Sequence, residues 1–167
     1  MRGAFVWALV VFSSPSPAAA FDHVRSEQAV IRAWIVEGYS QSATFKKLVD
    51  EVEGLPGIVY LDATVAVPRG LDGALLHRVA GSRSLPILRV QLRWNLSPAE
   101  GIATLAHELQ HVAEVLRGAQ TLDSSAMSAL FTSIDRAHVV GSSRFETEEA
   151  RQVTTRVRDE LARGRER

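Results

Sequence analysis

The segment from His107 to His111, with the sequence HELQH, constrains this chain more than any other feature. On an α-helix, side chains four residues apart lie on one face about 6 Å from each other, so both histidines can reach one metal ion. Glu108 would lie about 100° around the helix from His107, beside such an ion rather than on it. A carboxylate there can take a proton from a zinc-bound water. The segment therefore predicts a zinc site with His107 and His111 as ligands and Glu108 as the general base.

The surrounding residues predict that this segment lies on a buried helix. Ser97 can cap the helix start, Pro98 suits the first helical position, and Glu100 can complete a capping box. Gly118 is expected to mark the helix end. Apolar residues cover most of the circumference between these limits: Ile102, Leu105, Ala106, Leu109, Val112, Ala113 and Leu116. Two histidines and a glutamate are costly to bury unless something binds them, so the context favours a metal site over an ordinary helix surface.

The N-terminal segment 1–20 has the pattern of a secretory signal peptide. Arg2 supplies a positive start, residues 4–12 are apolar, and the alanines at 18–20 are small enough for cleavage. We expect a mature chain that begins at Phe21 and is exported, either periplasmic or secreted, with no stable membrane insertion after cleavage. The alternative is an uncleaved anchor, but the apolar run is short for one.

The composition limits the remaining possibilities. The chain has no cysteine, so its stability must come from core burial and from the metal rather than from disulfides. Its 19 basic and 19 acidic residues cancel, which argues against a nucleic-acid partner because no basic surplus is available to neutralise phosphates. Residues 21–167 are enough for a single domain with one core.

Periodicity predicts both helices and a small sheet. The helices are expected at 26–38, 42–53, 124–134 and 144–163, besides the one that carries the motif. The strands are expected at 58–61, 74–80 and 85–94, the last two joined by a turn at 81–84. In the last strand, Leu88, Val90, Leu92 and Trp94 should form the buried face. The predicted fold class is α+β, with a small antiparallel or mixed sheet packed on the motif helix and on a C-terminal glutamate helix.

A catalytic zinc ion usually has three protein ligands, so one more is needed. A third histidine six residues after the second is ruled out, because that position is Arg117. Glu114 shares the histidine face but lies one turn further along. It is expected either to orient His111 or to form an ordinary salt bridge.

The last helix offers three glutamates, and helical phase can choose among them. Its buried stripe is expected to be formed by Ala150, Val153, Val157 and Leu161. Glu146 lies within about 30° of the centre of this stripe and Glu149 about 85° away, with Glu148 on the opposite side. Glu146 is therefore the expected third ligand, and Glu149 the alternative. A further alternative is that none of the three is a ligand and that all three are present because acidic residues stabilise a helix N-terminus.

A His-Glu-x-x-His helix followed by a glutamate helix resembles the gluzincin metallopeptidases, and the Phe145-Glu146-Thr147 stretch is similar to the glutamate helix of small exported bacterial members. The resemblance extends from Leu85 to Leu161. It implies a zincin-like fold in which His107, His111 and Glu146 bind Zn²⁺ and Glu108 activates water. The chain departs from the family at Ala150 and Arg151, where many members have an acidic residue.

The expected function is an exported zinc metallopeptidase that hydrolyses peptide or protein substrates. Donors for the developing oxyanion could be His138, Tyr60, Arg144 or Tyr39, which the sequence does not rank. The strand from Leu88 to Trp94 is expected to offer a free edge to a substrate strand. The main alternative is a zinc-binding module without turnover, either a sensor or an inactive scaffold. A hydrolase acting on a non-peptide amide is another.

Overall fold

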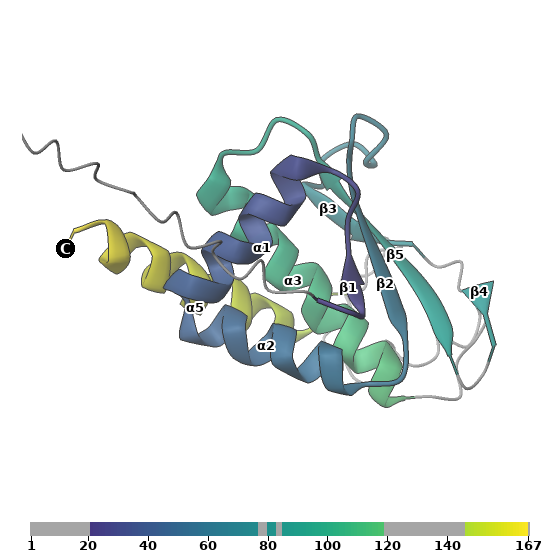
Figure 1. The fold of residues 1–167 in the computed structure, drawn as a ribbon. Coiled ribbons are helices and arrows are strands. Elements are labelled where there is room, and N and C mark those ends of the chain that lie inside the picture. Colours follow the sequence, from purple (N-terminus) through teal and green to yellow (C-terminus); the bar gives the residue numbers. More distant parts are fainter. Residues whose placement is uncertain (1–20, 77–79, 83–84, 119–145, 167) are drawn as a thin grey trace, which may run out of the picture.

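The computed structural model describes residues 21–76, 80–82, 85–118 and 146–166 (Figure 1). The expected signal peptide at 1–20, the helix at 124–134, His138 and Arg144 lie outside these residues. Within them, four helices and five strands form an α+β fold with a mixed sheet, as predicted. No described helix is long and apolar enough to cross a membrane.

The sheet contains β1 (Val24–Arg25), β2 (Ile58–Thr64), β3 (Gly73–Leu75), β4 (Ala80–Gly81) and β5 (Pro86–Arg93). β2 pairs in parallel with both β1 and β5, whereas β3 and β4 pair antiparallel with β5. The strand order is β1-β2-β5-β3, with β4 beside β5 on the same side as β3. The prediction that the Leu88–Trp94 strand has a free edge is therefore wrong, because β3 and β4 pair with β5 along that edge.

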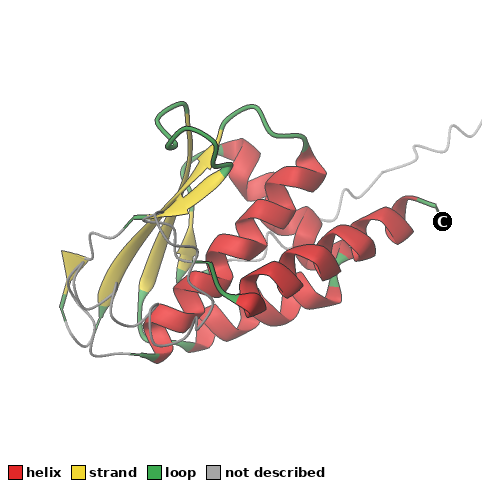
Figure 2. Cartoon of the chain, turned by 180° about the vertical axis from the view of Figure 1, so that it is seen from behind, coloured by secondary structure: helices red, strands yellow, loops and turns green. Residues whose placement is uncertain are grey.

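One face of the sheet is buried under the helices, which all lie on one side of it (Figures 1 and 2). In β5, Leu88, Val90 and Leu92 are completely buried, as the alternation predicts. Trp94 is 61% exposed, so it does not continue this buried face as expected. The reason is that β5 ends at Arg93 and the chain turns toward the next helix.

The four described helices are α1 (Ala29–Gln41), α2 (Ala43–Gly54), α3 (Pro98–Arg117) and α5 (Glu148–Arg165). α2 lies within one residue of the predicted bounds at each end, and the Ser42 hydroxyl accepts the Phe45 N–H and caps its start. α1 begins three residues later than predicted, at Ala29. α5 begins at Glu148 instead of 144, and Thr147 is its N-cap. This later start changes the interpretation of Glu146.

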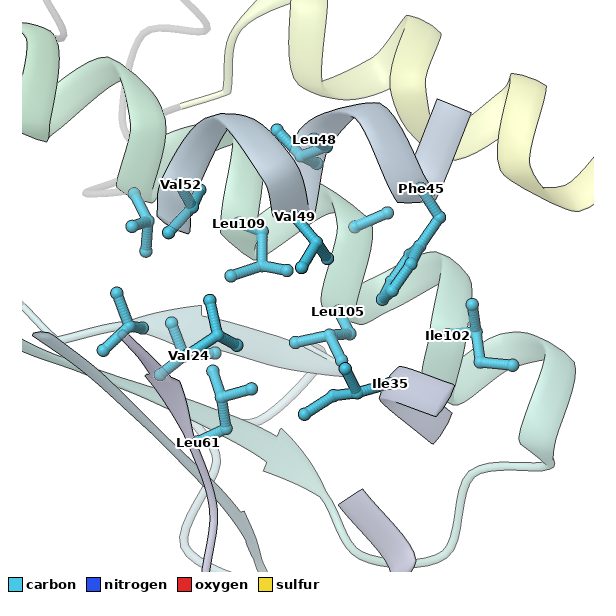
Figure 3. Close-up of a cluster of buried hydrophobic side chains, with 14 of the residues drawn as sticks. Val24, Ile35, Phe45, Leu48, Val49, Val52, Leu61, Ile102, Leu105 and Leu109 are labelled. Atoms are coloured by element: carbon cyan, nitrogen blue, oxygen red, sulfur yellow. The ribbon is translucent and has the colours of Figure 1, made fainter. Parts of the chain in front are cut away.

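α3 is the central helix of the fold. It begins with the predicted capping box of Ser97 and Glu100, has Pro98 in its first turn, and ends before Gly118. β3 and β5 pack on one side of it, and α1, α2 and α5 pack around the rest. Figure 3 shows Ile102, Leu105 and Leu109 of α3 in the core with side chains from the sheet and α2. The prediction of a helix buried over most of its circumference is confirmed.

Gly101 allows α1 to approach α3, and its replacement is expected to destabilise the fold. A Cβ at this position would lie 2.7 Å from ring atoms of Trp34, whose side chain is buried. Gly101→Ala should lower the free energy of unfolding by about 1–3 kcal/mol, because the ring cannot move without displacing the core. Urea unfolding followed by circular dichroism measures this change.

Gly54→Ala is the matched control, since no atom lies within 4 Å of a Cβ placed there, at the last residue of α2. This variant should be neutral or more stable by up to about 1 kcal/mol. Equal unfolding midpoints for the two variants would contradict the packing described for α1 and α3.

Candidate metal centre

Three side chains that ligate metals come together at the surface of α3. One ligand atom from each of His107, His111 and Glu146 lies within 4.8 Å of the other two. His107 Nε2 is 2.8 Å from Glu146 Oε1 and 3.1 Å from His111 Nε2. This group could bind a metal ion, and it consists of the three residues predicted as ligands.

The two histidines are brought together by helical geometry. They lie four residues apart on α3, with ring centroids 4.8 Å apart and ring planes at 81°. His111 is almost completely buried, whereas the side chain of His107 is 20% exposed. The pair therefore packs against the core on the side of His111, and solvent reaches it on the side of His107.

Glu146 reaches the histidines by a route that the sequence argument did not foresee. The prediction placed it on the buried stripe of a helix, but it precedes the N-cap Thr147, whose backbone is extended at φ −98° and ψ 152°. The helical phase that selected Glu146 therefore does not apply to it, although the residue does lie beside the two histidines. A threonine followed by two glutamates is a typical helix start, so the sequence did contain a signal for the later boundary.

Thr147 positions Glu146 by anchoring the start of α5 to α3. Its side chain is completely buried, and its hydroxyl donates to Glu114 Oε1 at 2.9 Å while accepting the Ala150 N–H. Because Glu146 is the preceding residue, this anchor holds it beside His107. The stripe of α5 packs on the core as predicted, with Ala150, Val157 and Leu161 buried.

Glu148 and Glu149, in the first turn of α5, are exposed to solvent. Glu148 is exposed and contacts Arg151 and Gln152 on its own helix. Glu149 is also exposed and does not belong to the group formed with the histidines. Among the glutamates at the start of α5, only Glu146 is placed to bind the same ion as His107 and His111.

Glu114 contacts His111, which is one of the two roles expected for it. Its Oε2 lies 3.0 Å from His111 Nδ1, and its Oε1 accepts hydrogen bonds from Gln110 and Thr147. Burial opposes the charge of this carboxylate, but these hydrogen bonds outweigh burial and lower the pKa of Glu114. A charged carboxylate can only accept, so His111 Nδ1 donates to Glu114 and Nε2 is the nitrogen left to bind a metal ion.

The charges of the group also suit a cation. Burial lowers the pKa of His107, but the hydrogen bond to Glu146 and the charges of Glu108 and Glu114 reverse this effect and raise it. The same hydrogen bond lowers the pKa of Glu146. Two imidazole nitrogens and a carboxylate oxygen this close together require a proton or a metal ion between them. Two histidines and one carboxylate form a common ligand set for catalytic zinc, so the residues present fit that ion.

Glu108 lies beside this group and beneath the sheet edge. It is only 5% exposed, and burial raises its pKa despite the nearby histidines and a hydrogen bond from the Leu75 N–H of β3. Gly73 of β3 makes this approach possible, because a Cβ there would lie 2.8 Å from Glu108 Oε1. The carboxylate is thus buried between α3 and β3.

Neither tyrosine considered as an oxyanion donor contacts the group in the described part of the chain. The Tyr39 hydroxyl donates to Asp50 and accepts from Lys46, so its hydrogen bonds are made to α2. Tyr60 lies on β2 and is half-buried. Arg117, excluded as a ligand, pairs with Glu51 of α2.

The sequence argument missed Thr147 and Thr154. Thr154 Oγ1 lies 3.0 Å from His107 Nδ1. It is one helical turn after Ala150, a residue of the predicted stripe, so its place on α5 was a usable signal.

No protein-family model, curated protein or solved structure matches this chain. The assignment of the metal centre therefore depends on the geometry of the described residues.

Substitution of the glutamates should separate a ligand from its neighbours. Glu146→Ala should greatly reduce metal binding, because it removes one of three ligands, whereas Glu148→Ala and Glu149→Ala should leave binding unchanged. His107→Ala or His111→Ala should abolish binding. Metal content per chain after dialysis, measured by atomic emission, checks this. If Glu149→Ala is the damaging change instead, the placement of Glu146 is wrong.

Proposed function

We propose that the metal is zinc and that the chain is a zinc-dependent peptidase acting outside the cytoplasm. The observation that carries this proposal is the convergence of His107, His111 and Glu146 next to the buried carboxylate of Glu108. Two imidazoles and one carboxylate leave a coordination position for water or substrate, as catalytic zinc sites do. Structural zinc sites usually have four protein ligands and are rich in cysteine, which this chain lacks.

Zinc in such a site supplies Lewis acidity, which lowers the pKa of water and polarises a carbonyl group. The protein's own contribution is the movement of protons. Glu108 would accept a proton from the attacking water and deliver it to the leaving amine.

The outer edge of β3 lies next to Glu108. The backbone of Arg93 donates to Asp72 O, and the backbone of Leu76 donates to Arg89 O. The backbone groups of Asp72 and Leu76 therefore face β5. By the alternation of an antiparallel ladder, the backbone groups of Gly73 and Leu75 point away from β5, toward the side where Glu108 lies. The Leu75 N–H on this edge already donates to Glu108, so an extended peptide that paired with β3 would have to displace that hydrogen bond.

The burial of Glu108 favours a second candidate, a zinc-binding module without turnover. A base that is 5% exposed and bonded to a backbone N–H of β3 has limited access to water. The peptidase is preferred because a site without chemistry has no use for a carboxylate beside its metal. The location outside the cytoplasm is proposed from the signal-peptide pattern of residues 1–20 alone.

Glu108→Gln should distinguish the two candidates. If Glu108 transfers protons, this variant should keep its zinc and lose turnover by several orders of magnitude, because only the proton acceptor is removed. The measurement is cleavage of a broad peptide library by mass spectrometry, with zinc content determined on the same samples. Glu149→Gln, at an exposed glutamate outside the group, is the control and should behave as the wild type.

Two results would contradict the peptidase assignment. Loss of zinc from Glu108→Gln would make Glu108 a ligand rather than a base. Equal cleavage by Glu108→Gln and the wild type would show that the activity does not use this residue. A wild-type chain that holds zinc and cleaves no peptide would favour the module.

A further inference from the structure

The hydroxyl of Thr154 lies between two partners, and only one assignment of protons satisfies both. Thr154 Oγ1 is 2.7 Å from Ala150 O and 3.0 Å from His107 Nδ1. Two oxygens at 2.7 Å need a proton between them, and the hydroxyl has only one proton, so it donates to the Ala150 carbonyl. The hydroxyl oxygen must then accept from His107. Nδ1 of His107 therefore carries hydrogen, which leaves Nε2, the nitrogen nearest Glu146 and His111, as the one available to a metal ion.

We propose that Thr154 is a positioning residue of the metal centre, which holds His107 in the tautomer and ring orientation that present Nε2 to the metal. This inference rests on the proposed metal site, but it does not require that the site be catalytic. Nε2 is the atom that faces Glu146 Oε1 and His111 Nε2, so the ring is oriented as ligation requires. A partner of this kind for the second nitrogen of a ligand histidine fixes the tautomer and raises metal affinity.

The two histidines are thus held by different chemistry. His111 Nδ1 is bonded to the buried carboxylate of Glu114, which also has two other hydrogen bonds. His107, the more exposed of the two, has a neutral hydroxyl from another helix. Thr154 also joins α5 to α3 at the level of the ligands.

Thr155 provides a matched control on the next position of α5. Its hydroxyl donates to Arg151 O at 3.0 Å, which is the same type of bond as that from Thr154 to Ala150, but Thr155 is exposed. Replacing either threonine by valine removes this bond and changes helix propensity in the same way. Only at position 154 does the change also remove the acceptor for His107.

The test uses the full chain with zinc as the probe. Thr154→Val should weaken zinc binding about 10- to 100-fold in a competition titration with a chromogenic chelator, the effect usual for loss of such a partner. Thr154→Ser should restore most of the affinity, and Thr155→Val should bind zinc as the wild type does. Circular dichroism of each variant checks that the fold is retained.

A spectroscopic signature distinguishes positioning from a general structural effect. In the zinc-loaded wild type and in Thr154→Ser, the Nδ1–H proton of His107 should give a resonance protected from exchange with water, because it is hydrogen-bonded. Thr154→Val should lose this resonance and keep that of His111, whose acceptor is Glu114.

Unchanged affinity and an unchanged His107 resonance in Thr154→Val would overturn the proposal. So would equal losses of affinity in Thr154→Val and Thr155→Val, which would indicate an effect on the helix alone. Neither readout depends on peptide cleavage. If the chain binds zinc and hydrolyses nothing, the peptidase proposal is overturned, but zinc affinity and the His107 resonance still test the role of Thr154.

Discussion

The fold depends on hydrogen-bond partners for the polar, titratable side chains that α3 carries into the core. α3 is enclosed by the sheet and three helices, yet it carries Glu108, His111 and Glu114, each at least nine-tenths buried. A charged group left without partners at such depth costs more than a single hydrogen bond supplies. The neighbouring elements must therefore bring polar groups to these positions as well as apolar contacts.

β3 and the start of α5 supply these polar groups. β3 approaches α3 closely at Gly73 and donates the Leu75 N–H to Glu108. The start of α5 brings the Thr147 hydroxyl to Glu114, and through Thr147 it delivers Glu146 to His107. The candidate metal centre is thus assembled by the same contacts that dock β3 and α5 on the core. A metal ion bound there would strengthen the join between α3 and α5, because its ligands come from both sides of that join.

The sequence predicted those parts of the structure that depend on local rules. The capping box at Ser97, the length of α3, the position of α2 and the buried alternation in β5 follow from residues close together in the chain. The three residues predicted as ligands also lie together, in a group that could bind a metal ion. The pairing of β3 and β4 with β5, which removes the expected free edge, is a tertiary choice that a single strand pattern does not contain.

Glu146 shows most clearly how local reasoning fails. A helix expected from 144 placed Glu146 on a buried stripe, but the capping of α5 by Thr147 leaves Glu146 outside the helix, and it reaches the histidines from the preceding segment. Thr147 and Thr154 were missed because a threonine hydroxyl has no preferred partner until the fold supplies one. Their roles arise only when Glu114 and His107, more than thirty residues away in sequence, are brought to them.

The central claim is that two imidazoles and one carboxylate bind a metal ion with an open position beside Glu108. A crystal structure of the chain grown with zinc, with anomalous scattering recorded at the zinc edge, tests it most directly. The account predicts one zinc ion at about 2.0–2.2 Å from His107 Nε2, His111 Nε2 and a Glu146 oxygen, with no fourth protein ligand. Zinc held by a fourth side chain in a closed shell, or ligated by Glu108, would contradict it.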